Sequence, residues 1–354
     1  MLKKKMSKNT RSNLITYGIV IVAFIVMQTL ISTGSISSLM EGLMIPLCIY
    51  IILAVSLNLV VGILGELSLG HAGFMCVGAF ASAFFSKCMR DVITIAPLRF
   101  FLALLIGVAV AAVFGIIIGI PVLRLKGDYL AIVTLAFGEI IKNLVNVLFI
   151  GKDSNGFHFS TKDVMDLNME ADGTVIVNGP QGITGTPQDS TFVIGVILIL
   201  ITLFIVINMV NSRDGRAIMA IRDNRIAAES VGINVTKYKL MAFTVSAALA
   251  GAAGVLYAHN LSTLTANTNN FGYNMSINIL VFVVLGGIGS IRGSMIAAVV
   301  LTLLPELLRG LSDYRMLIYA IVLIIMMLFN WSPKAIEWRE KYLSFGKKKK
   351  EAVK

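Results

Sequence analysis

The chain has 354 residues, of which 57% are hydrophobic and 14% charged, and its formal net charge is +11. Soluble domains carry about 25% charged residues, so this composition excludes a soluble globular protein and indicates one that crosses a membrane several times. The three cysteines have no CxxC spacing and lie in or near apolar segments, which predicts packing residues rather than disulfides or metal ligands. They are Cys48, Cys76 and Cys88.

Ten apolar segments approach the roughly 20 residues that a helix needs to cross a bilayer. Two of them, residues 72–85 and 276–285, are short, which predicts short or broken helices near the middle of each half. The first of the ten segments, residues 14–31, has an apolar run that is too long for a cleavable signal peptide, and no A-x-A cleavage site follows it. We therefore expect it to be a retained span. The sequence predicts an all-α polytopic membrane protein with about ten transmembrane helices. The predicted spans are residues 14–31, 43–64, 72–85, 100–123, 129–150, 191–210, 240–258, 276–285, 294–308 and 314–331.

Charge is distributed unevenly along the chain. Residues 1–13 carry five basic residues and no acid, residues 332–354 are also basic, and residues 151–190 carry six acids against two lysines. Because basic loops tend to stay inside, both termini are predicted to be cytoplasmic and residues 151–190 external. The two transmembrane halves are then residues 14–150 and 191–331. Nucleic-acid binding is disfavoured, because no aromatic residues are interleaved with the basic tails.

Five crossings in each half mean that the second half enters the membrane from the opposite face, as in an inverted repeat. The segments VSLNLVVGIL at residues 55–64 and AALAGAAGVL at residues 247–256 occupy comparable places, and each precedes a polar break. We therefore expect two five-helix halves related as an inverted repeat.

The stretch GELSLGHAGFMCVGAF, residues 65–80, is unusually polar and rich in glycine for a membrane segment. Each glycine in a helix costs about 1 kcal/mol relative to alanine, and Glu66, Ser68 and His71 would be costly against lipid. Transporters bind substrates at such interrupted helices, since freed backbone groups can meet the carboxylate and ammonium of a zwitterion. The alternative is a short cytoplasmic turn in which His71 is solvated.

Charged pairs mark two other spans. Glu139 and Lys142 lie three residues apart on one predicted helical face, and Glu306 and Arg309 repeat this spacing. A charge at mid-bilayer costs about 2.5–3.5 kcal/mol, so we expect Glu139 near the outer end, either in an interfacial ion pair or at the external mouth of a path. The glycine-rich stretch VVLGGIGSIRGSMIAA, residues 283–298, fits close helix packing.

The stretch NSRDGRAIMAIRDNRIAAESVGINVTKYK, residues 211–239, is the longest strongly charged segment between apolar spans. A helix over residues 215–232 would be amphipathic, with Asp214 capping its start and Gly232 ending it. Such a helix would dock at the cytoplasmic face, either on anionic lipid or on a partner subunit. Its predicted apolar face comprises Ala217, Ala220, Ile221, Ala227, Ala228 and Val231.

The sequence lacks the motifs of catalysis. It contains no GxxxxGK[ST] loop, so the chain is not a P-loop ATPase, and no HExxH, CxxC or GxSxG motif. The histidines are far apart, at His71, His158 and His259. We predict no enzyme activity and no metal or cofactor site in this chain.

Residues 227–232 match the Ala-Ala-x-x-x-Gly pattern in the coupling loop of permease subunits of ATP-binding cassette (ABC) importers, with Ile226 where the pattern begins with glutamate. The longer run GRAIMAIRDNRIAAESVGINVTKYKLMAFTVSAALAGAAGVLYA resembles the M-type permease of branched-chain amino acid importers. The segments at residues 65–80, 123–145 and 283–298 resemble the same family, so the likeness extends over most of the chain.

The resemblance implies two sets of functional residues. Coupling to ATPase subunits would involve Arg216, Ile221, Arg222, Ala227, Ala228, Glu229 and Gly232. The substrate path would be lined by Ser68, Gly70, His71, Gly73, Glu139, Gly286 and Gly287.

The resemblance also implies a heteromeric importer in a bacterial cell membrane. Its parts would be a sister permease, two cytoplasmic ATPases that bind ATP and Mg, and an external substrate-binding protein pressing on residues 178–187. Leucine, isoleucine and valine would be the substrates, and urea or another small amide is the first alternative. A stand-alone ion-coupled transporter is the alternative from another class, and it predicts buried acids that titrate, such as Glu66, Glu139 or Glu306.

Overall fold

The fold is given by a computed structural model. It describes residues 8–35, 37–90, 92–125, 127–170 and 173–308, together with residues 314, 317, 318, 320, 321, 323–325 and 328. Half of the tenth predicted span, residues 314–331, and the whole basic tail at residues 332–354 lie outside this set.

Within the described residues, nine apolar helices coincide with the first nine predicted spans, which confirms an all-α polytopic membrane protein. Six have the length and composition needed to cross a membrane. The third and eighth predicted spans correspond to shorter helices, and the ninth is short as well. The six long helices are α1 (Lys8–Ser32), α2 (Ser38–Asn58), α4 (Ala96–Val122), α5 (Asp128–Val147), α6 (Phe192–Asn211) and α9 (Val235–Ala258), and the shorter ones are α3 (His71–Cys88), α11 (Tyr273–Gly286) and α12 (Ile291–Leu307).

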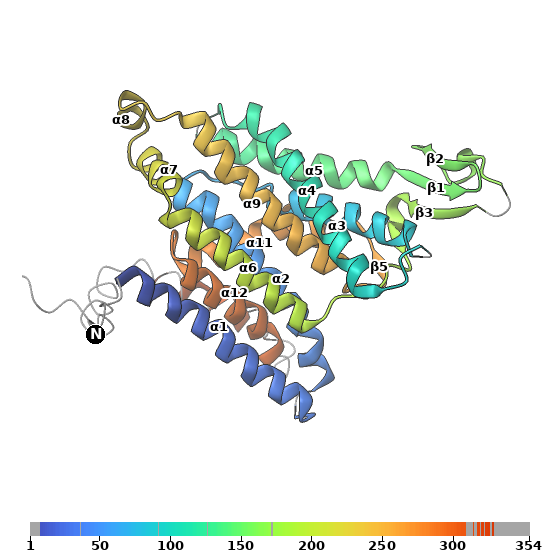
Figure 1. The fold of residues 1–354 in the computed structure, drawn as a ribbon, viewed down its shortest axis with the longest axis horizontal. Helices are drawn as coiled ribbons and strands as arrows, with labels where there is room; N and C mark the ends of the chain where they lie inside the picture. Colours follow the sequence, from blue (N-terminus) through green and yellow to red (C-terminus); the bar gives the residue numbers. More distant parts are fainter. Residues whose placement is uncertain are drawn as a thin grey trace, which may run out of the picture.

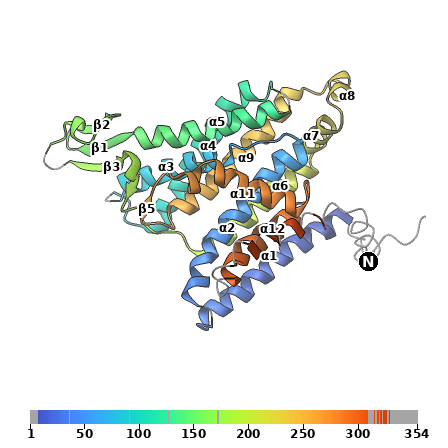
Figure 2. The ribbon, with the colours of Figure 1, turned by 180° about the vertical axis from the view of Figure 1, so that it is seen from behind.

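The centre of the bundle is α9, which packs against α2, α3 and α4 (Figures 1 and 2). Small residues let these backbones come close. A Cβ built on Gly254 of α9 would lie 2.1 Å from the carbonyl oxygen of Met75, and one built on Gly115 of α4 would lie 2.8 Å from the Cβ of Ala247. These small residues therefore serve close helix packing.

A small antiparallel sheet follows the fifth span, in the segment for which the sequence predicts only an external acidic character. No strand was predicted there, although the alternating Phe157 and Phe159 and the β-branched residues before Asn178 favour strands. The fifth span, predicted to reach residue 150, ends at Val147 instead. The sheet has the order β2-β1-β3 and consists of β1 (Phe149–Asp153), β2 (Gly156–Ser160) and β3 (Thr174–Asn178).

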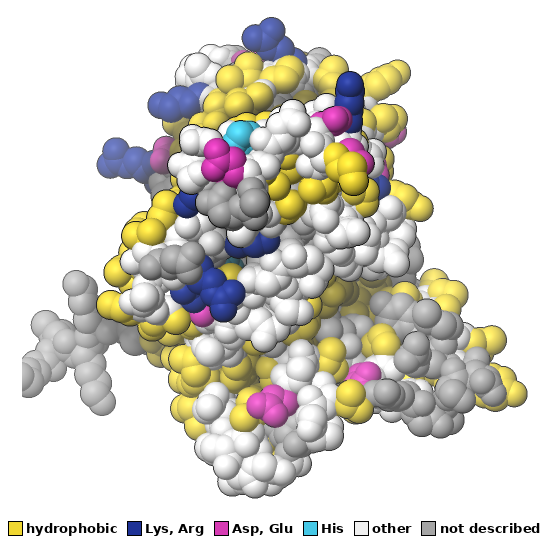
Figure 3. All heavy atoms as spheres, turned by 90° about the vertical axis from the view of Figure 1, so that its right-hand side faces the viewer, with side chains coloured by type: hydrophobic (Ala, Val, Ile, Leu, Met, Phe, Trp, Pro, Cys, Tyr) yellow, Lys and Arg dark blue, Asp and Glu magenta, His cyan; other side chains and the backbone are white. Residues whose placement is uncertain are grey.

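We call residues 149–178 the lobe. The ammonium of Lys87, at the end of α3, donates to the carbonyl oxygens of Val175 and Ile176 at 2.8 and 3.2 Å and ties the lobe to the bundle. The segment that follows pairs as β4 (Ile183–Thr184) with β5 (Thr263–Leu264), the strand after α9. Figure 3 looks onto this end and shows acidic, basic and hydrophobic side chains interspersed over it.

Two of the six acids counted in residues 151–190 point inward. Asp189 pairs with Arg99 at 2.7 Å, with both side chains nearly buried. The Oδ1 of Asp153 accepts from the backbone N–H groups of Asn155 and Gly156 at 2.8 and 3.1 Å, and its Oδ2 lies 2.9 Å from His158 Nε2. Asp153 therefore organises the turn between β1 and β2.

The lobe is expected to loosen in acid through Asp153. Loss of water acts to raise the pKa of this carboxyl, but hydrogen bonds from the backbone of Glu170 and Asn155, and from His158, outweigh it and lower the pKa. Because the folded pKa lies below the unfolded value, the stabilisation is complete above about pH 4 and is lost as the pH falls through the folded pKa. A spin label at Phe157 should become more mobile over that range.

The matched variant is Asp153→Asn, which replaces one acceptor oxygen by a donor. Its label should be mobile at every pH. A label whose mobility falls with acid in the parent, or is equally low in both proteins at neutral pH, would contradict this role of Asp153.

Candidate functional site

Regular structure is interrupted between α2 and α3, at residues 65–70, and we call this interruption the break. Helix α2 continues as the π-helix η1 (Leu59–Leu64) and ends at Gly65, whose φ of 81° suits a residue without a Cβ. The chain then runs without regular structure until α3 begins at His71. π-Helical turns inside α-helices are frequent at functional sites.

Polar groups from four helices meet at this break. His71 is 2% exposed, so the alternative of a solvated histidine is wrong; its Nε2 lies 2.7 Å from the Oγ of Ser56. The hydroxyl of Ser246 in α9 donates to the Ser56 carbonyl at 2.6 Å. One of the first N–H groups of α3 is also satisfied, since Ala72 N donates to Ser276 Oγ at 3.2 Å.

Two buried polar atoms at the break have no hydrogen-bond partner among the described residues. They are the Oγ of Ser68 and the Nδ2 of Asn58. The Oδ1 of the same Asn58 accepts from Gly289 N at 2.9 Å. Unsatisfied groups of this kind are rare and call for an explanation, so Ser68 and Asn58 are the side chains best placed to meet a polar ligand.

The glycines predicted to line the path lie at backbone contacts instead of facing an open space. A Cβ on Gly70 would lie 2.5 Å from the carbonyl oxygen of Thr134, and one on Gly73 would lie 2.7 Å from the Cα of Gly138. These residues bring α3 and α5 together beside the break. Their place on a substrate path remains a prediction.

Glu139 lies in α5, and its carboxylate caps the start of α11. Its Oε2 lies 2.5 Å from the ammonium of Lys142, which also donates to Thr268 Oγ1 at 3.1 Å. Its Oε1 accepts from the backbone N–H of Tyr273 at 2.8 Å. A carboxylate is stabilised at a helix N-terminus, so the pair holds α5 against α11 and the short helix before it, α10 (Thr268–Phe271).

Gly286 and Gly287 form the tight connection between α11 and α12. A Cβ on Gly286 would lie 2.4 Å from the backbone of Gly293, and Gly287 has a φ of 92°. This connection carries Gly289 against Asn58, and therefore lies beside the π-helix. Of the second charged pair predicted in the sequence, Glu306 lies in α12, and Arg309 is outside the described residues.

The coupling segment contains two helices, although the sequence predicts one over residues 215–232. They are α7 (Arg213–Asp223) and α8 (Arg225–Ser230). Asn224 separates them, because its backbone is extended and its side-chain oxygen accepts from Ala227 N at 3.0 Å. Such an N-cap starts a new helix.

The caps differ from the prediction at one end only. Ser212 caps α7 by accepting from Gly215 N at 3.1 Å, so the predicted cap at Asp214 is wrong. At the other end Gly232 has a φ of 84°, and its N–H donates to Glu229 O at 3.0 Å. Gly232 therefore terminates α8, as predicted.

The break at Asn224 turns part of the predicted apolar face outward. Ile221, Ala228 and Val235 form a small buried cluster that holds α8 in place. Val231, predicted to be on the buried face, is 75% exposed, and Ile226 is 80% exposed. The exposed Ala227 lies beside them, so α8 presents a small apolar surface at one end of the molecule (Figure 1). All three charged residues predicted to couple to the ATPases are exposed, namely Arg216, Arg222 and Glu229.

Arg222 reaches away from this surface. Its Nη1 donates to the carbonyl oxygen of Gly62 in the π-helix at 3.0 Å, and a Cβ on Gly65 would lie 2.5 Å from the Cγ of Arg222. Beside it, the ammonium of Lys239 forms a buried ion pair with Glu66. Neither Lys239 nor Asn58 was identified as a site residue from the sequence. Asn58 could have been noticed, because it is a polar residue inside the apolar run VSLNLVVGIL.

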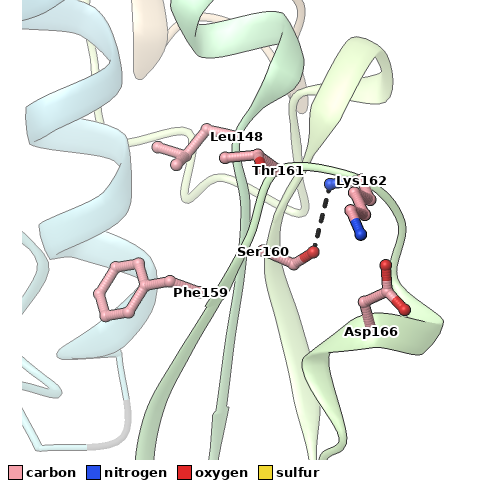
Figure 4. Close-up of a pocket in the computed structure, with 6 residues that line it drawn as sticks. All are labelled: Leu148, Phe159, Ser160, Thr161, Lys162 and Asp166. Atoms are coloured by element: carbon pink, nitrogen blue, oxygen red, sulfur yellow. Dashed lines mark hydrogen bonds between the residues drawn. The ribbon is translucent and has the colours of Figure 1, made fainter.

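No group of three or more histidine, cysteine or acidic residues in the described part of the chain could hold a metal ion. A polar hollow of about 430 Å³ on the lobe is shown in Figure 4, where Lys162 N donates to the Oγ of Ser160 at 3.2 Å. Its other lining residues include Phe159 and Asp166, and it lies on the strands rather than at the break. These residues offer no catalytic constellation.

Comparison with known proteins identifies the relatives of the chain. The high-affinity branched-chain amino acid transport system permease protein LivM of Salmonella typhimurium is 35% identical over 297 residues, which cover 81% of this chain and 67% of the relative. The LivM protein of Escherichia coli K12 is 36% identical over 298 residues, with the same coverage. The ribose import permease protein of Escherichia coli K12 is 28% identical over 292 residues, 79% of this chain and 81% of the relative. No solved structure matches.

The family model for the permease component of branched-chain amino acid transport systems matches residues 39–329, which include the break, the coupling segment and the lobe. Together with the two relatives above 30% identity, this match covers most of the chain. The chain belongs to the family of permease components of branched-chain amino acid transport systems.

Proposed function

We propose that this permease carries leucine, isoleucine and valine into the cytoplasm as one subunit of an ABC importer. The names of its relatives support the substrate class. The observation that supports the coupling role is the exposure of Ile226 and Val231 at the short helix α8, which lies at the end of the molecule opposite the lobe (Figure 2). An exposed apolar surface on a charged segment is typical of a docking site.

The partners we propose are a sister permease, two cytoplasmic ATPases holding ATP and Mg, and an external substrate-binding protein. In this arrangement the α8 end faces the cytoplasm of a bacterial cell, together with both termini, and the lobe faces outward. The absence of a GxxxxGK[ST] loop from the sequence supports placing ATP hydrolysis in the partners. The two partly buried acids near the break and at the start of α11, Glu66 and Glu139, are both paired with lysines, which gives an ion-coupled transporter less support.

Replacing Ile226 by lysine is expected to reduce binding-protein-dependent leucine uptake at least tenfold. The residue is 80% exposed, so the variant should fold, but an ammonium group in a desolvated apolar contact is strongly unfavourable. The test uses proteoliposomes that contain the four kinds of subunit, with ATPase co-purification as a second readout. Both uptake and co-purification should fall.

The matched control is Val92→Lys, at a valine that is 74% exposed between α3 and α4, at the end that carries the lobe. It should leave both readouts unchanged. Normal uptake by the Ile226 variant would overturn the docking role of α8. Uptake of ribose or urea in place of leucine by the parent complex would overturn the substrate class.

A further inference from the structure

Three structural elements meet where α7 touches the membrane-embedded part of the chain. We call Gly62, Gly65, Glu66, Arg222 and Lys239 the junction. It joins the end of the π-helix η1, the end of α7 and the start of α9. Of the exposed charged residues of the coupling segment, Arg222 is the one whose side chain enters this junction by a hydrogen bond to the π-helix.

The local backbone explains why the π-helix needs Arg222. The N–H groups of Gly65 and Glu66 both donate to the carbonyl of Val60, two residues before Gly62. Arg222 supplies a donor to the Gly62 carbonyl at 3.0 Å. A charged donor makes a hydrogen bond roughly twice as strong as a neutral one, so α7 holds the end of this helix.

Two features orient the Arg222 side chain. Its Nε and Nη2 donate to the Oδ1 of Asp223 at 3.1 and 3.0 Å, on the exposed side. Its aliphatic stem crosses Gly65, where any Cβ would collide with it. The guanidinium is therefore held at both ends, between the solvent-facing carboxylate and the buried carbonyl.

Gly62 has a second neighbour on another element. A Cβ on Gly62 would lie 2.3 Å from Gly289 N and 2.0 Å from the Oδ1 of Asn58. That same Oδ1 accepts the hydrogen bond from Gly289 N. A displacement of α7 that moves Gly62 must therefore also move the connection between α11 and α12.

We propose that Arg222 is a positioning residue that transmits the motion of α7 to the intramembrane break and to the α11–α12 connection, rather than a contact for the ATPases. The inference rests on the proposed function, because partner ATPases supply the motion. Packed helices move as rigid bodies between discrete arrangements. The Oγ of Ser68 and the Nδ2 of Asn58 have no hydrogen-bond partner in this arrangement of the helices. They would gain partners in a second arrangement of the helices or when a substrate binds.

The first test is Arg222→Met, which keeps the aliphatic stem over Gly65 and removes the donor. In proteoliposomes with all partner subunits, ATPase co-purification and ATP hydrolysis should stay within about twofold of the parent, while leucine uptake should fall at least tenfold. The ATP hydrolysed per leucine transported should rise accordingly. The matched control is Arg124→Met, at the exposed arginine between α4 and α5, with no change in either activity.

The second test follows the break directly and needs no substrate. With a Ser68→Cys replacement, the labelling rate by a membrane-impermeant maleimide should change at least threefold when a nonhydrolysable ATP analogue is added to the assembled complex. The native cysteines of the unsubstituted chain give the background. In the Arg222→Met background this nucleotide response should disappear, and in the Asp223→Asn background it should weaken.

The outcomes separate the two proposals. Loss of ATPase co-purification in Arg222→Met would make Arg222 a docking residue and overturn the inference. An unchanged coupling ratio, or an unchanged nucleotide response at position 68, would overturn it as well. If the parent complex shows the nucleotide response but carries no leucine, the inference holds and the proposed substrate fails.

Discussion

Replacing Gly254 by leucine is expected to abolish the folded monomeric permease. A Cβ at this position would lie 2.1 Å from the carbonyl oxygen of Met75 and 2.9 Å from the backbone nitrogen of Ala79. Both atoms belong to the backbone of α3, so no side-chain rotation relieves the contact and α3 must separate from α9. The readout is the amount of monodisperse protein recovered in detergent and the temperature at which it is lost.

Alanine at the same position tests the argument more finely. Overpacking of this kind costs about 1–3 kcal/mol, which exceeds the roughly 0.5–1 kcal/mol that alanine gains over glycine inside a helix. The matched control is Gly42→Ala in α2, where a built Cβ meets nothing within 4 Å. Gly42→Ala should be as stable as the parent or more so. Equal stability of the two alanine variants would refute close packing at Gly254.

The membrane-embedded part of the fold could be predicted because lipid imposes one dominant rule on sequence. Each span must satisfy its own backbone hydrogen bonds and present apolar side chains, so runs of apolar residues locate the helices to within a few positions. The break at Gly65 was also visible, because glycines and polar residues interrupt an otherwise apolar run. The predicted inverted repeat of two five-helix halves stays a prediction.

The coupling segment shows where helical periodicity fails. Counting at 3.6 residues per turn treats residues 215–232 as one helix and puts Val231 on the face of Ile221. Asn224 instead caps a second helix, which changes the direction of the chain and of the side chains that follow it. Asparagine is a common N-cap, but its choice between a helix interior and a cap depends on tertiary contacts that the sequence does not display.

The contacts that build the site were the least predictable part. Arg222 and Gly62 are 160 residues apart, and Asn58 and Gly289 are 231 apart. Periodicity and spacing describe neighbours along one helix and carry no information about such pairs. For the same reason the long-range cap that Glu139 provides to Tyr273 N at the start of α11 was not predicted. Its pairing with Lys142, three residues along the same helix, was predicted, and its place on a path stays a prediction.

The buried pair of Glu66 and Lys239 should give the second large effect. Their side chains are 16% and 5% exposed, and they join the break to the start of α9. Removing one member of a buried pair leaves an uncompensated charge and costs about 3–5 kcal/mol. Lys239→Met and Glu66→Gln should each destabilise the protein by this order, as measured by denaturant unfolding of the purified permease.

The double variant tests whether the two side chains act as a pair or separately. When Glu66→Gln and Lys239→Met are combined, no unpaired charge remains, so most of the stability lost in either single variant should return. The matched control is the exposed pair of Arg225 and Glu229 in α8, 3.0 Å apart, where removing the arginine should cost less than about 1 kcal/mol. Strictly additive losses at Glu66 and Lys239 would show that the two residues act separately, and the junction would then lack the ion pair that joins the break to α9.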